Sequence, residues 1–141
     1  MNWNGKRAFV RSVLVATGVF YLITAAALTL APVWFFDNIG NYPPYNRHFQ
    51  GDAGTFVLGL ALILLWAWRD PARYRAIIAL VAVGSLAHAV NHVIDDFIVN
   101  PSAGSMSANV ILFIFAAAQF LAAWWATPEV MAASARKLAS A

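Results

Sequence analysis

With 141 residues, of which 62% are hydrophobic and 11% charged, and a mean hydropathy of +0.67, the chain falls outside the range of soluble globular domains. It is predicted to be one integral membrane domain over residues 1–141, and its nine Lys and Arg are dispersed at the ends of apolar runs, which argues against a nucleic-acid partner. Because the chain has no cysteine, any metal must be held by His, Asp or Glu.

Four apolar runs are each close to the roughly 20 residues that a membrane-spanning helix needs. They predict spans over about residues 12–36, 48–68, 76–96 and 108–126, and therefore an all-α, antiparallel four-transmembrane-helix bundle. Pro32 is expected to kink or end the first helix near residues 28–31, because its ring opposes the preceding turn and removes an amide donor. The second run reaches full length only by extending upstream through Asp52 and His48, so its outer end must be polar.

Basic residues predict the orientation of the four spans. Arg47 is the single basic residue predicted on one side of the membrane. The residues predicted on the other side are Lys6, Arg7, Arg11, Arg69, Arg73, Arg75, Arg136 and Lys137. The positive-inside rule then places both termini in the cytoplasm. The external end holds most of the acids, together with aromatic side chains that suit interfacial anchors: Trp34, Tyr42, Tyr45 and Phe49.

Polar side chains concentrate at this external end, above all in the stretch HAVNHVIDD, residues 88–96. Helical positions four apart differ by about 40° and positions seven apart by about 20°, so His88, His92 and Asp95 share one face, with Asp96 at its edge. The preceding span carries a comparable stripe: His48, Asp52, Thr55 and Gly59. A tight turn, RDPARYR, joins the two spans and predicts that they are antiparallel neighbours. Residues at equal depth in the two spans are then expected to pair: Gly59 with Gly84, Thr55 with His88, Asp52 with His92, and His48 with Asp95 or Asp96.

These side chains have the types and spacing of a helical metal site. The predicted ligands are His48, Asp52, His88, His92 and Asp95, and they would suit zinc, iron or manganese. An interhelical clamp and a proton or ligand pathway are the alternatives. A haem fits less well, because His88 and His92 project from one helix face and cannot both be axial ligands of one iron. Asp96 taken alone is more typical of a solvated acid at a helix end, and Asp95 is expected to be the better placed of the two.

The predicted function is an enzyme with this metal site near the extracytoplasmic face. Open metal positions would suit hydrolysis or hydration of an amphipathic substrate, or oxidation of an apolar one. Residues assigned to a pocket or to a second layer around the metal are Thr55, Asn91, Asp96, Tyr21 and Gln119, although interhelical hydrogen bonding also accounts for several of them. The alternative is a non-catalytic subunit of a membrane complex, whose His and Asp cluster clamps helices or docks a partner.

The stretch NRHFQGDAGTFVLGLAL, followed by a short basic turn and HAVNHVIDD, resembles small bacterial membrane proteins grouped as DoxX-like. The resemblance covers residues 46–96 and rests on hydropathy together with His48, Asp52, His88 and His92. It implies a four-helix bundle in the bacterial inner membrane. Because that grouping has no single activity, the resemblance implies little about chemistry.

Overall fold

The computed structural model describes residues 1–99 and 106–132, and every regular element in these ranges is helical. The elements, in chain order, are α1 (Trp3–Leu30), α2 (Pro32–Asn38), α3 (Arg47–Ala67), α4 (Arg75–Ile94), the π-helix η1 (Asp95–Val99) and α5 (Met106–Trp125). Helices α1, α3 and α4 continued through η1 are long and apolar enough to cross a membrane, and Asn109–Trp125 is a shorter apolar helix. The prediction of an all-helical membrane protein is therefore confirmed at this level.

Local sequence signals explain where the first helices begin and end. The side chain of Asn2 caps α1 by accepting a 2.8 Å hydrogen bond from the amide of Gly5. The helix ends at Leu30, and Pro32 is the first residue of α2, so the predicted effect of Pro32 is confirmed. The predicted first span, residues 12–36, therefore covers parts of two helices.

The third helix begins at the polar stretch that the sequence required. The side chain of Asn46 accepts a 3.1 Å hydrogen bond from the amide of Phe49 and caps α3. The helix therefore begins at Arg47, and both His48 and Asp52 lie in its first two turns. The helix begins one residue before the start predicted for the second span.

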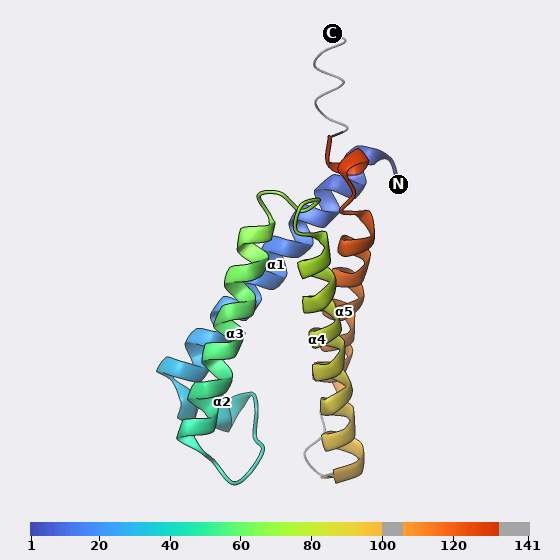
Figure 1. The fold of residues 1–141 in the computed structure, drawn as a ribbon. Coiled ribbons are helices and arrows are strands. Elements are labelled where there is room, and N and C mark those ends of the chain that lie inside the picture. The colour runs from blue at the N-terminus through green and yellow to red at the C-terminus, as the bar shows by residue number, and fades with distance from the viewer. Residues whose placement is uncertain (100–105, 133–141) are drawn as a thin grey trace.

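The helices form two pairs, α1 with α3 and α4 with α5, which meet at one end of the molecule and diverge toward the other (Figure 1). Glycines allow the close contact within the first pair: a Cβ on Gly54 would lie 2.7 Å from Cγ2 of Thr29, and one on Gly18 would lie 2.8 Å from Cγ of Leu65. The main apolar core lies where the pairs meet, and consists of Val10, Leu14, Leu64, Ala67, Ile78, Val81, Ala122, Ala123 and Ala126. Contact between α3 and α4 is slight, because each of them packs mainly on another helix.

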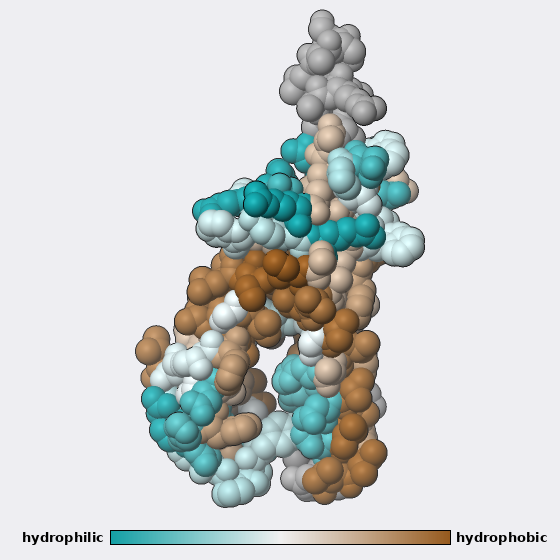
Figure 2. Space-filling model, viewed as in Figure 1, coloured by the Kyte–Doolittle hydropathy of each residue, from teal (hydrophilic) through white to brown (hydrophobic). Residues whose placement is uncertain are grey.

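Basic and aromatic side chains surround the end where the pairs meet. Figure 2 shows a hydrophilic belt there, above a hydrophobic surface. The guanidinium of Arg11 lies 5.6 Å from the ring centre of Trp68, and that of Arg69 lies 4.8 Å from Trp66. Arg75 instead reaches α5, where its Nε donates a 2.8 Å hydrogen bond to the carbonyl of Ala123. The belt has the composition of a membrane interface.

Candidate functional site

The two polar stripes expected to face each other are separated in the structure. Figure 2 shows an opening between α3 and α4 in the half of the molecule away from the basic belt. A Cβ on Gly59 or on Gly84 would meet no atom within 4 Å, so the predicted contact between these glycines is wrong. The prediction assumed that a tight turn makes α3 and α4 packed neighbours along their whole length, whereas α3 packs on α1 instead.

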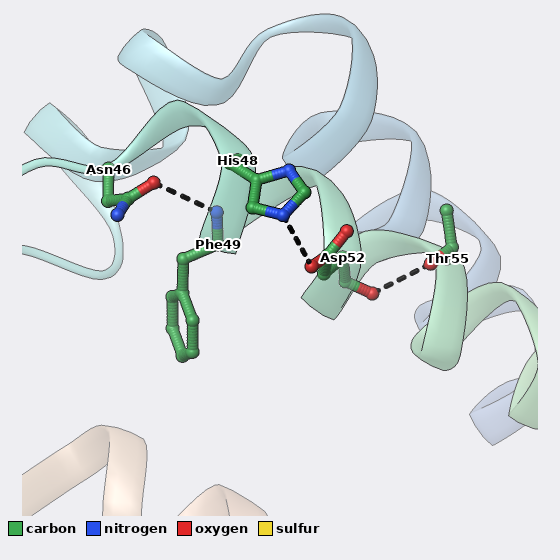
Figure 3. A network of polar contacts seen from close by, with 5 residues as sticks. All are labelled: Asn46, His48, Phe49, Asp52 and Thr55. Carbon is green, nitrogen blue, oxygen red and sulfur yellow. Dashed lines mark hydrogen bonds and ion pairs between the residues drawn. The ribbon is translucent and has the colours of Figure 1, made fainter.

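The α3 stripe lies on the side of that helix opposite its contact with α1. The buried positions of α3 include Gly54 and Ala61, which are about half a helical turn around the axis from His48 and Asp52. Nε2 of His48 lies 3.3 Å from Oδ2 of Asp52, and the two side chains are 89% and 57% exposed (Figure 3). The hydroxyl of Thr55 donates to the backbone oxygen of Asp52 at 2.8 Å. These predicted site residues therefore bond within α3, and such an exposed pair adds little to stability.

The two histidines of α4 lie against each other. His88 is exposed and His92 half-buried, and their ring centres are 4.5 Å apart in an edge-to-face arrangement. They lie in the half of α4 that borders the opening, where the other exposed or half-exposed hydrophilic side chains are Asn91 and Asp95. A separation of four residues on a helix is a common spacing for two histidines that bind the same metal ion.

A buried carboxylate beside this pair joins the two halves of the molecule. Asp96 is only 1% exposed; its Oδ2 accepts a 2.7 Å hydrogen bond from Nδ2 of Asn109 on α5. Its Oδ1 accepts a 2.6 Å hydrogen bond from the hydroxyl of Tyr42, in the loop before α3. The partial burial of Tyr42 and its bond to Asp96 raise the pKa of the phenol well above its ordinary value, so Tyr42 stays protonated.

The proton on Tyr42 determines which nitrogen of His92 is free. The Tyr42 oxygen also lies 3.1 Å from Nδ1 of His92, and the two rings are in edge contact with centres 5.7 Å apart. A phenol has one hydrogen, and Tyr42 gives it to Asp96, so toward His92 it can only accept. Nδ1 of His92 must then carry a hydrogen, and in the neutral ring Nε2 keeps a free lone pair.

The structure reverses the expected roles of the two neighbouring aspartates. Asp95 is half-exposed and accepts a 2.9 Å hydrogen bond from Asn91, one turn earlier on the same helix. Asp96, expected to be solvated, is the buried one because it continues the stripe that packs on α5: Ile78, Ala82, Ser85 and Ala89. It follows Ala89 by seven residues, which returns to nearly the same side of a helix.

Three other polar side chains meet inside the bundle, at a different level. The hydroxyl oxygens of Tyr21 and Ser85 are 2.7 Å apart, and Ser85 donates a 2.7 Å bond to Oε1 of Gln119. Nε2 of Gln119 donates back to Tyr21 at 3.3 Å, and Gln119 is fully buried. This triangle joins α1, α4 and α5, so Tyr21 and Gln119 have the interhelical role that was one of their two expected roles.

In the part of the chain that the structure describes, no three His, Asp or Glu side chains are gathered closely enough to hold a metal ion. The five predicted ligands instead form the pair His48 and Asp52 on α3, the pair His88 and His92 on α4, and Asp95, which is bonded to Asn91. Each pair offers two ligands at most in this arrangement. Metal binding therefore stays a prediction.

Two residues of the network were not among the predicted site residues. Tyr42 was expected only as an interfacial anchor, and Asn109 was not considered. Asn109 and Asp96 are separated by nearly equal numbers of residues from the middle of the segment between η1 and α5, and this equal spacing in the sequence is a signal that could have paired them. No comparable signal exists for Tyr42, which is brought in by the path of a loop.

Comparison of the chain with known protein families, with curated proteins and with solved structures gives no match. The resemblance to DoxX-like proteins is therefore neither supported nor contradicted.

Proposed function

We propose that this chain is an integral membrane protein whose α4 histidines, His88 and His92, bind a divalent transition metal from the extracytoplasmic side. The observation that carries the proposal is the hydrogen-bonded chain from Asp96 through Tyr42 to Nδ1 of His92. In metalloproteins, a histidine ligand commonly donates its other ring N–H to such a partner, which fixes the ring and its tautomer. Here the chain leaves Nε2 of His92 free, and the rings of His92 and His88 are in edge-to-face contact.

The remaining ligands come from the surroundings of the pair. Asp95 lies on the same side of α4, and one of its oxygens is held by Asn91. We propose that its carboxylate turns to become a third ligand, and that water or a substrate occupies the other positions. Two imidazoles with one carboxylate suit zinc, iron or manganese.

The direction of access follows from the distribution of charge. Eight of the nine Lys and Arg belong to the segments at the belt end or to the C-terminal segment, and Arg47 alone belongs to the opposite end. By the positive-inside rule, both termini are cytoplasmic and the histidines lie near the outer face. A metal there would supply an activated water or a site for oxygen, and the neighbouring opening would admit an apolar or amphipathic substrate.

Isothermal calorimetry tests the binding step directly. Apo-protein prepared with a chelator should bind one Zn²⁺ per chain, and His92→Ala should abolish the heat of binding. His48→Ala is the matched control, because His48 is an exposed histidine of α3 that pairs with Asp52 on its own helix. Equal binding by all three proteins would refute the assignment to α4.

A second candidate function, an accessory subunit of a membrane complex, is favoured by the α3 stripe. His48, Asp52 and Thr55 are exposed on a membrane-spanning helix, on the side away from α1. Polar side chains in such a place are commonly satisfied by a neighbouring helix. Crosslinking from position 55 in native membranes tests this candidate: adducts with another membrane protein support it, and crosslinks to lipid alone contradict it.

A further inference from the structure

An apolar groove lies between α3 and α4 just below the basic belt. Its volume is about 410 Å³, and it is lined by Leu62, Ile63, Trp66, Ala67, Tyr74 and Ile77. Figure 2 shows hydrophobic surface directly under the hydrophilic belt, at the top of the opening between the two helices. The groove therefore lies at the boundary between the acyl chains and the headgroups of a bilayer.

Two arginines stand beside this groove, each held by one of its aromatic side chains. The guanidinium of Arg69 lies 4.8 Å from the ring centre of Trp66, and that of Arg73 lies 5.7 Å from that of Tyr74. Among the described residues, neither guanidinium forms an ion pair with a carboxylate. The nearby Asp70 accepts a hydrogen bond from the backbone amide of Arg73, not from its side chain.

We propose that this groove is a binding site for an anionic phospholipid of the cytoplasmic leaflet. One acyl chain occupies the apolar groove, and the phosphate lies between the guanidinium groups of Arg69 and Arg73. Guanidinium groups bind phosphate oxygens through paired N–H donors. Stacking on an aromatic ring already restricts the arginine side chain, so binding phosphate costs less conformational entropy. The proposal does not depend on metal binding at the opposite end.

Native mass spectrometry of the full-length protein in detergent tests the headgroup contact. We expect bound phosphatidylglycerol to exceed phosphatidylcholine of the same acyl chains, and Arg69→Gln with Arg73→Gln to lower phosphatidylglycerol retention by on the order of tenfold. The control variant, Lys6→Gln with Arg7→Gln, removes the same charge from α1 and should retain the lipid. Equal loss in both variants would overturn the site in favour of general charge attraction.

The groove itself is tested by filling it. Ile63→Trp should reduce retention of phosphatidylglycerol, whereas Ile114→Trp, on an exposed part of α5, should not. Inorganic phosphate distinguishes a lipid from a free anion: it should fail to displace bound phosphatidylglycerol at millimolar concentration. Displacement by phosphate, or unchanged retention in Ile63→Trp, would refute the acyl-chain contact. Circular dichroism of each variant checks that the helices are intact.

Discussion

The hydroxyl of Tyr42 donates a 2.6 Å hydrogen bond to Oδ1 of Asp96, and this bond joins the loop before α3 to η1, directly after α4. Among the described residues, the hydrogen bonds of Tyr42 are the ones that connect the two helix pairs at the end where they diverge. The same hydroxyl sets the tautomer of His92. Tyr42 therefore both connects the two helix pairs where they diverge and fixes the tautomer of His92.

Tyr42→Phe should weaken metal binding without removing a ligand. The variant loses the oxygen that accepts from Nδ1 of His92, so the ring is no longer held in one tautomer. Loss of such an outer partner typically lowers metal affinity by about 10-fold to 100-fold. Zinc titration measures the change, and Tyr45→Phe is the control because Tyr45 lies in the same loop and its ring packs on Phe36 instead of on His92. Equal affinity in Tyr42→Phe and the native protein would contradict the proposed role.

Stability should fall at alkaline pH because of the same residue. Burial and the bond to Asp96 raise the pKa of Tyr42 in the folded protein, while in the unfolded chain it stays near its ordinary value of about 10. Below that value both states are protonated and the contribution is complete. As the pH rises above it, the unfolded state loses the proton first, so unfolding becomes easier.

Chemical unfolding in detergent between pH 8 and pH 12 measures this slope. The native protein and Tyr45→Phe should lose stability above about pH 10, and Tyr42→Phe should lose less. Parallel curves for Tyr42→Phe and the native protein would show that Tyr42 does not hold its proton as the geometry requires.

Asp96→Ala should destabilise the protein far more than Asp95→Ala. Removing the Asp96 carboxylate takes away the acceptor of the hydrogen bond from the buried Asn109 amide, and we expect a cost of about 2 to 4 kcal/mol. Asp95 is half-exposed and bonds within its own helix, so its removal should change stability by less than about 0.5 kcal/mol. Unfolding by denaturant compares the two variants. The exchange Asp96→Asn with Asn109→Asp should recover part of the loss, because donor and acceptor are swapped.

The orientation can be tested without background labelling, since the chain has no cysteine. Asn41→Cys lies in the exposed loop before α3, and Asp70→Cys lies in the exposed turn before α4. In intact bacterial cells, a membrane-impermeant maleimide should label Asn41→Cys, whereas Asp70→Cys should react only after the cells are permeabilised. The opposite pattern would place the histidines on the cytoplasmic side.

Sequence reasoning predicted the helices well and their packing unevenly. Helix limits follow from local features, such as Pro32 at the start of α2 and Asn46 at the cap of α3. Counting residues outward from the segment between η1 and α5 would pair Ser85 with Gln119 and Asp96 with Asn109. Both pairs are hydrogen-bonded, but neither was among the predictions. The same arithmetic failed for α3 and α4, because a short turn fixes where two helices start but not whether they stay in contact.

The candidate site shows the same division. Helical periodicity placed His88 and His92 on one side of α4, where they lie together. The same periodicity indicates that Asp96 is buried, because Asp96 repeats the positions of α4 that face α5. The prediction of a solvated acid instead followed from the polar character of Asp96. The contribution of Tyr42 depends on a loop that crosses between two helix pairs, and no periodic pattern encodes that path.

Elemental analysis of protein purified without added chelator is the most direct test of the metal centre. We expect about one zinc, iron or manganese per chain in the native protein and in His48→Ala. We expect the metal to be lost in His88→Ala and in His92→Ala, with helical content unchanged. Absence of stoichiometric metal from the native protein, or full retention when both α4 histidines are replaced, would contradict metal binding by these histidines.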